Sequence, residues 1–181
     1  MPLNTAEVFT HLSRTWCVDA HRLTTDSAQQ AHLLEGSFVA DILSLWDGRT
    51  ESWLTGSPII IRLEECDVAL FTMREPYLAP YFGCVETESP VASLPTQGEA
   101  EACGEGHTPT KTERHSIFWK TLRPCSYAIG RQLKELAFET DVEGNILAAV
   151  AHLDDEATLR ITSFGAECAI DTGMPLLAQA V

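Results

Sequence analysis

The stretch GSFVADILSLWDG at residues 36–48 is echoed later in the chain by GRQLKELAFETDVEG at residues 130–144. Each stretch opens with a glycine and places a branched or leucine side chain three residues on, Val39 in the first and Leu133 in the second. Each then runs through mixed apolar and acidic positions into a turn that contains Asp and Gly. This likeness predicts one structural unit that occurs twice.

The segments that follow the two stretches have the same order. After the first come a returning arm (ESWLTG), a strand (SPIIIRLEE), an acidic turn and a further strand (VALFTM). After the second come ILAAVAHL, the acidic DDE and ATLRIT. Setting Leu63 against Leu153 aligns Ile61 with Ala151, and alternate residues of a strand share one face. The alternative is a pair of β-meanders that share only the general rules of sheet construction.

Strand patterns outnumber helical ones, and short turns join neighbouring strands. The predicted fold is therefore β-rich α+β, with antiparallel sheets formed by two similar β-meander units. An N-terminal helix is predicted over residues 4–16, with Asn4 or Thr5 as its N-cap. Residues 26–36 fit either a short helix or the lead-in to a strand.

Composition divides the chain into three parts. The first, residues 1–85, holds the N-terminal helix and the first β unit, and residues 116–181 hold the second unit. Between them, residues 86–115 are rich in Glu, Thr, Pro and Gly and nearly empty of large apolar side chains. Such a segment buries too little surface to order itself, so it is expected to be a flexible acidic linker or a long loop. The two units could still share one core.

The charge limits the partners that the chain can bind. The 181 residues carry 26 acidic and 12 basic side chains, for a net charge of -14. Binding to DNA or RNA depends on clustered Lys and Arg, so nucleic acid is not expected as a partner. No apolar run could span a bilayer, no secretion signal is recognised, and the 6 cysteines are spread singly. We expect a cytoplasmic protein with reduced thiols and no membrane contact.

Motifs for chemistry are sparse. Two C-x3-H pairs, Cys17 with His21 and Cys103 with His107, could supply zinc ligands, but nothing brings them together. The acidic turns lack the spacing of a calcium loop, so no metal or cofactor is expected.

Catalysis is left open but not favoured. The sequence contains no G-x-S-x-G, H-E-x-x-H, P-loop or dinucleotide-binding motif. His152 lies two residues before Asp154 and could be oriented as a general base. A histidine at a strand end is, however, more often structural.

The favoured hypothesis is a non-catalytic, acidic protein-binding module that is steered by its charge to a basic partner. Inhibitors and immunity-type proteins that neutralise cationic toxins are of this kind, and the likeness is in composition only. Two tryptophans flank a predicted hairpin turn, and aromatic side chains in a charged surround are common in binding interfaces. The predicted contact residues are Trp46, Glu51, Trp53, Glu64, Glu65 and Asp67.

The alternative hypothesis is a small-molecule binder or enzyme with a pocket between the two β units. Arg62 and His152 occupy matched places in the proposed repeat, and Arg160 lies on the neighbouring strand. These side chains could together hold an anionic ligand. Cross-strand ion pairs are the simpler interpretation of the same residues.

Overall fold

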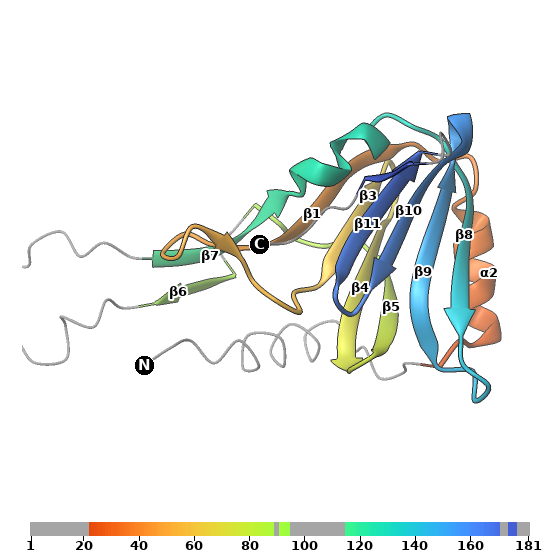
Figure 1. The fold of residues 1–181 in the computed structure, drawn as a ribbon, viewed down its shortest axis with the longest axis horizontal. Coiled ribbons are helices and arrows are strands. Elements are labelled where there is room, and N and C mark those ends of the chain that lie inside the picture. Colours follow the sequence, from red (N-terminus) through yellow and green to blue (C-terminus); the bar gives the residue numbers. More distant parts are fainter. Residues whose placement is uncertain (1–21, 89–90, 95–114, 171–173, 177–181) are drawn as a thin grey trace, which may run out of the picture.

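The fold is a β-rich α+β arrangement of two antiparallel sheets, seen in a computed structural model that describes residues 22–88, 91–94, 115–170 and 174–176 (Figure 1). The helix predicted at residues 4–16 and most of the predicted 86–115 linker lie outside the described residues. The segment left open at residues 26–36 is largely helical. This helix, α2 (Thr25–Leu33), is capped by the Thr24 hydroxyl, which accepts a hydrogen bond from the Ser27 amide.

The first sheet contains the four predicted strands of the first unit and three later ones. Its seven strands run in the order β5-β4-β3-β1-β7-β6, with β2 paired to the end of β1. The strands are β1 (Val39–Asp47), β2 (Ser52–Trp53), β3 (Ile59–Leu63), β4 (Asp67–Arg74), β5 (Tyr77–Gly83), β6 (Ala92–Leu94) and β7 (His115–Thr121). Although β7 follows the 86–115 segment in sequence, it pairs with β1 and extends the first sheet.

The second sheet is a simple meander. Its five strands run in the order β12-β11-β10-β9-β8. The strands are β8 (Leu133–Thr140), β9 (Ile146–Leu153), β10 (Ala157–Thr162), β11 (Gly165–Ile170) and β12 (Met174–Leu176), with the short 3-10 helices η1 (Arg123–Ala128) before β8 and η2 (Asp154–Glu156) before β10. The second unit thus repeats the arm, return, acidic turn and third strand of the first.

The two sheets pack face to face over one apolar cluster. From the first sheet, Ile59, Ile61 and Leu63 enter this cluster, and from the second sheet Ala149, Ala151 and Leu153 occupy the aligned positions. Ile59 and Ile61 thus correspond to alanines on the second sheet, whereas Leu63 corresponds to the leucine Leu153.

The segments that lead into the first strands of the two units, residues 36–39 and 130–133, pair with each other. We call this contact the crossing. Gly36 and Gly130 both have positive φ, +90° and +82°, which turns the chain sharply into each strand. The backbone hydrogen bonds at the crossing form matched pairs: Gly36 N to Leu133 O with Gly130 N to Val39 O, and Val39 N to Arg131 O with Leu133 N to Ser37 O. Setting Gly36 on Gly130 maps each bond onto its mate. An approximate two-fold axis therefore passes beside Phe38 and Gln132, which face each other in an isolated bridge.

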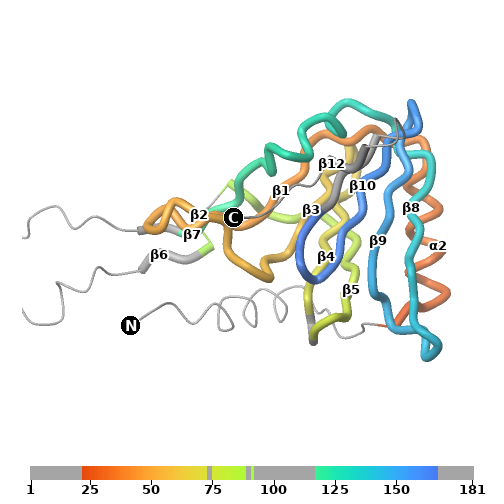
Figure 2. The backbone as a smooth tube through the Cα atoms, in the orientation of Figure 1, coloured from red at the N-terminus to blue at the C-terminus, as the bar shows by residue number. Residues whose placement is uncertain are grey.

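Each unit covers the first strand of the other. Helix α2, which precedes the first unit, packs on β8, and η1, which precedes the second unit, packs on β1 (Figure 2). Ala31 from α2, and Cys125 and Ala128 from η1, are buried in the shared core. The exchange of covering elements joins the two units into one packed body.

Candidate functional site

The two acidic turns lie at the same end of the molecule. Val39 pairs with Leu63, the last residue before the first turn, and Leu133 pairs with Leu153, the last residue before the second. The path from one turn to the other runs from β3 to β1, across the crossing to β8, and on to β9. Because neighbouring strands are about 4.8 Å apart, the two turns are roughly 15 Å from each other. The carboxylates gathered here form a surface that we name the acidic pole: Glu35, Glu64, Glu65, Asp155 and Glu156, which are exposed, and Asp154, which is partly buried.

The second acidic turn is held against the crossing by Arg131. Its guanidinium donates to the Asp154 carbonyl oxygen at 3.2 Å and to an Asp155 carboxylate oxygen at 3.0 Å. The Asp154 amide donates to the Gln132 carbonyl at 2.9 Å. Asp155 and Glu156 have positive φ, 55° and 58°, which fits their place in a tight turn. The backbone thus fixes where these carboxylates point.

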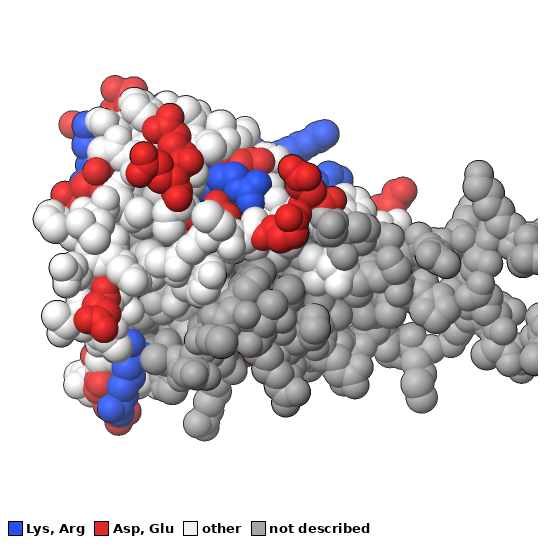
Figure 3. Space-filling view, turned by 180° about the vertical axis from the view of Figure 1, so that it is seen from behind, with Lys and Arg blue, Asp and Glu red and all other residues white. Residues whose placement is uncertain are grey.

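An exposed aromatic side chain lies between the two turns. Phe38 is 43% exposed at the crossing itself, and Ile129 is 37% exposed just before Gly130. Figure 3 shows the upper part of one face of the molecule with several groups of carboxylates and fewer Lys or Arg side chains between them. An apolar centre inside a charged rim is the usual anatomy of a protein interface.

The structure places the predicted contact residues in separate parts of the molecule. Trp46 and Trp53 lie at the far end of β1 from Val39, where their rings meet edge to face with centroids 5.0 Å apart. The Lys120 ammonium lies 3.6 Å from the centroid of the Trp46 ring, a cation–π contact. Glu51 occupies the adjoining turn, so these three residues are separated from Glu64 and Glu65 by the length of β3.

Asp67 is not a surface residue, which corrects its place in the predicted contact set. It is 6% exposed, and its carboxylate accepts hydrogen bonds from the Arg62 Nε at 3.1 Å and the Val85 amide at 2.8 Å. Arg62 also donates to the Val85 carbonyl oxygen at 2.9 Å. Asp67 begins β4 directly opposite Arg62 in β3, so the pair fastens the segment after β5 to the sheet.

The alternative set of Arg62, His152 and Arg160 is not brought together. Each of these residues alternates along its strand with side chains of the shared core, so each points outward from its own sheet. Arg62 therefore lies on one outer face of the sandwich, and His152 and Arg160 lie on the other. Arg160 forms an ion pair with Glu139 at 2.6 Å. They cannot line a common pocket between the units.

The pKa shifts of Glu139, Asp141 and Cys66 are explained by local hydrogen bonds and burial. The hydrogen bond from Arg160 lowers the pKa of Glu139, and the hydrogen bond from the Asn145 side chain lowers the pKa of Asp141. Burial raises the pKa of the Cys66 thiol, and the nearby Asp67 charge acts in the same direction. A thiol with a raised pKa stays protonated at neutral pH and is a poor nucleophile.

Within the described ranges, no group of three or more His, Cys, Asp or Glu side chains is placed to hold a metal ion, and the two C-x3-H pairs fall outside those ranges. In the same part of the chain, no helix is both long and apolar enough to cross a membrane.

Comparison with known proteins found no match: no family model, no curated protein sequence and no solved structure is similar to this chain. The site must therefore be interpreted from its own geometry.

Sequence reasoning missed Phe38 and the meeting of the two acidic turns. The register that set Leu63 on Leu153 already placed RLEE opposite HLDD. The crossing could not be predicted from the sequence. Strand periodicity indicates which residues share a face of one strand, but not how two units pair with each other.

Proposed function

We propose that this chain is a non-catalytic protein-binding module whose acidic pole binds a basic partner. An inhibitor or immunity-type role in the cytoplasm would be of this class. The observation that carries the proposal is the meeting of two acidic turns at one end of the molecule, with Phe38 exposed between them. A net charge of -14 adds long-range attraction for a cationic surface.

Two features of the pole support binding more than folding. Glu64 and Glu65 are exposed, and no ion pair to them appears among the described residues. Such carboxylates contribute little to stability but can raise an association rate. Phe38 supplies an apolar side chain that a partner could bury, which would hold the complex after the charges have steered it.

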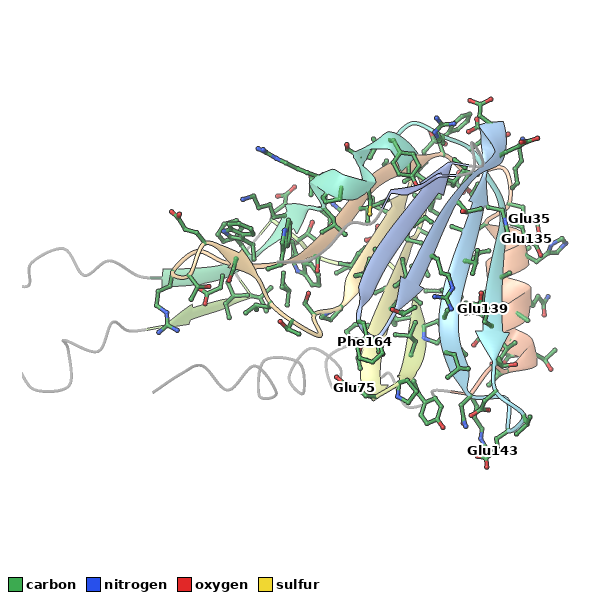
Figure 4. The ribbon with its side chains drawn as sticks, in the orientation of Figure 1. Glu35, Glu75, Glu135, Glu139, Glu143 and Phe164 are labelled. Atoms are coloured by element: carbon green, nitrogen blue, oxygen red, sulfur yellow. The ribbon has the colours of Figure 1, made fainter. Side chains whose placement is uncertain are left out.

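The test compares two charge-reversal pairs that change the net charge equally. The pole variant is Glu64→Lys with Glu65→Lys, and the control is Asp26→Lys with Glu143→Lys, which are exposed and lie away from the pole. Figure 4 shows Glu143 at the opposite end of β8 from Glu35. The partner is first recovered from extract with the wild-type chain, identified and purified.

Association rates are then measured by stopped flow. We expect the wild-type rate to fall about tenfold or more from about 50 mM to about 500 mM salt. The pole variant should slow association about tenfold at low salt, while the control variant slows it by no more than about threefold. A rate that ignores salt, or equal slowing by the two variants, would overturn the proposal.

A further inference from the structure

Two cysteines lie next to each other where the pairing of β4 with β5 ends. The last pair of facing residues in these antiparallel strands is Asp67 opposite Gly83. Cys66 precedes Asp67 and Cys84 follows Gly83, so the two cysteines occupy the next facing positions. The Cys66 Sγ lies 4.0 Å from the Gly83 carbonyl oxygen, which brings this sulfur to the residue that adjoins Cys84. Two thiols that are distant in sequence are therefore neighbours in space.

The backbone hydrogen bonds show what kind of facing positions these are. The Leu63 amide donates to the Cys66 carbonyl oxygen at 3.0 Å, so the backbone polar groups of Cys66 face β3 and not the chain of β5. Facing residues of an antiparallel pair that exchange no hydrogen bonds have Cα atoms about 4.5 Å apart. A disulfide needs a Cα separation of about 4.4–6.8 Å. Such positions thus suit a disulfide.

The segment that carries Cys84 is fastened on both sides of this residue. Gly83 pairs with Asp67 in the sheet, and the Val85 amide donates to the Asp67 carboxylate at 2.8 Å. The Arg62 guanidinium donates to the Val85 carbonyl oxygen at 2.9 Å and to the Asp67 carboxylate at 3.1 Å. Because the residues before and after Cys84 are both fixed to Asp67, Cys84 is held beside the start of β4.

The two thiols differ in exposure and lie within electrostatic reach of each other. Cys84 is exposed, whereas Cys66 is half-buried. Burial raises the pKa of the Cys66 thiol, and negative charges on Asp67 and Cys84 act in the same direction. A compound in solution therefore reaches Cys84 first, and Cys66 is the neighbour that can react next.

We propose that Cys66 and Cys84 are a redox modification site, which forms a reversible disulfide by exchange with a small disulfide compound. The Cys84 thiolate attacks one sulfur of the compound, which forms a mixed disulfide and releases one thiol. The Cys66 thiolate then attacks the Cys84 sulfur, which forms the bond between the cysteines and releases the second thiol. The compound gains the two electrons that the cysteines lose, and the two cysteine protons end on the released thiols.

The setting of the pair fits a reversible site. Disulfides in cytoplasmic proteins are usually transient and redox-sensing, and an exposed thiol beside a second thiol is typical of such sensors. The exposed Glu64 and Glu65 directly precede Cys66, and their negative charge attracts cationic compounds. Cystamine, a small disulfide with two positive charges, is therefore the probe of choice.

The test treats the reduced full chain with cystamine at about pH 8.5, where free thiols are partly ionised. Remaining thiols are blocked with N-ethylmaleimide, and the digested product is mapped by mass spectrometry. Trypsin cuts between the two cysteines after Arg74, and a glutamate-specific protease cuts after Glu86, which separates Cys84 from Cys103. The expected product is the peptide with Cys66 joined to the peptide with Cys84.

A second measurement asks whether the fold favours this bond. The ratio of oxidised to reduced pair is measured at a fixed ratio of cystamine to its thiol, cysteamine. This ratio should be at least about tenfold higher in native buffer than in about 8 M urea, because folding already holds the thiols together. The oxidised chain should correspondingly unfold at a higher urea concentration than the reduced chain.

Variants separate the two thiols. Cys66→Ser should stop at a mixed disulfide of Cys84 with cysteamine, because the second attack is lost. In Cys84→Ser, cystamine should modify Cys66 at least about tenfold more slowly than it modifies Cys84 in Cys66→Ser. Cys103→Ser is the matched control and should still form the bond. These are near-isosteric changes at positions outside the shared core, so the variants should fold, and circular dichroism checks this.

Three outcomes would overturn the proposal. They are a disulfide that joins Cys84 mainly to a cysteine other than Cys66, mixed disulfides on both residues with no bond between them, and an oxidised fraction no higher in native buffer than in urea. None of these measurements needs the partner of the acidic pole, so the two proposals fail independently.

Discussion

The outer faces of the two sheets differ although their inner faces match. On the first sheet the outer face is a second apolar cluster that includes Leu43, Ile60, Ala69 and Phe71. On the second sheet the outer face carries His152, Arg160 and Glu139, which are partly or fully exposed. The shared core fixes one face of each unit, and the other face is free to serve a different purpose.

The difference between the two outer faces can be seen at one pair of positions, Ile60 in β3 and Val150 in β9. They occupy aligned positions when Leu63 is set on Leu153, yet Ile60 is 0% exposed and Val150 is half-buried. The outer cluster of the first sheet extends to Trp119 in β7 and to Val85 and Val91, which follow β5. Those segments have no described counterparts on the second sheet, so the same backbone position has a different environment.

The largest expected effect is at these aligned positions. Ile60→Ala should lower the free energy of unfolding by about 2–5 kcal/mol, because it leaves a cavity in a packed cluster. Val150→Ala should cost less than about 1 kcal/mol, because much of that side chain already faces water. Urea unfolding of both variants measures the contrast, and equal losses would remove the distinction between the two outer faces.

Two acidic residues that bind arginine give the next contrast. Asp67→Asn should cost about 2 kcal/mol, because a buried carboxylate loses its charge-assisted bonds to Arg62 and the Val85 amide. Asp155→Asn should cost about 0.5 kcal/mol or less, because Asp155 is 84% exposed and its ion pair with Arg131 is screened by water. Thermal unfolding compares them. A large loss at Asp155 would mean that the acidic pole serves folding more than binding.

The two glycines at the crossing test the approximate symmetry. Gly36→Ala and Gly130→Ala should each cost about 1–2 kcal/mol, because a side chain is strained at positive φ. Crowding adds little, since a Cβ at Gly130 meets nothing within 4 Å and at Gly36 meets only the Gln132 amide nitrogen at 3.9 Å. Equal losses of unfolding free energy in the two variants, measured by urea unfolding, would support the approximate symmetry of the two units. A loss in only one variant would contradict that symmetry.

The smallest effect is a pH dependence on the outer face of the second sheet. The pKa of Glu139 is lowered in the folded chain by Arg160, so this ion pair stabilises the fold above the ordinary glutamate pKa. That gain is lost as the pH falls through the lowered pKa, below about 4.5. In Arg160→Gln the Glu139 pKa, followed by carbon-detected NMR, should return toward its ordinary value. An unchanged pKa would mean that the contact is not formed in solution.

Much of the fold could be predicted from the sequence because strand periodicity is local. The alternation in SPIIIRLEE placed Ile59, Ile61 and Leu63 on one face, and the structure confirms this. Alternation alone does not show that Ile60, on the opposite face of the same strand, is also buried. That burial depends on β7 and on residues after β5, which no property of the strand itself reports.

The sites were harder to predict because they depend on packing between distant segments. Asp67 looked like one more carboxylate in an acidic turn, but its place opposite Arg62 buries it. Cys66 and Cys84 are spread singly in the sequence, and only the pairing of β4 with β5 brings them together. Hydropathy patterns cannot indicate such meetings.

Amide hydrogen exchange at the crossing tests the central claim most directly. If two similar units are joined into one body by matched hydrogen bonds, the amides of Gly36, Val39, Gly130 and Leu133 should be among the most protected in the chain, opening only with global unfolding. Protection should also reduce the exchange rates by similar factors within each matched pair of amides, Gly36 with Gly130 and Val39 with Leu133. Rapid exchange at these four amides, beside slow exchange in β3 and β9, would show that the units do not cross as described.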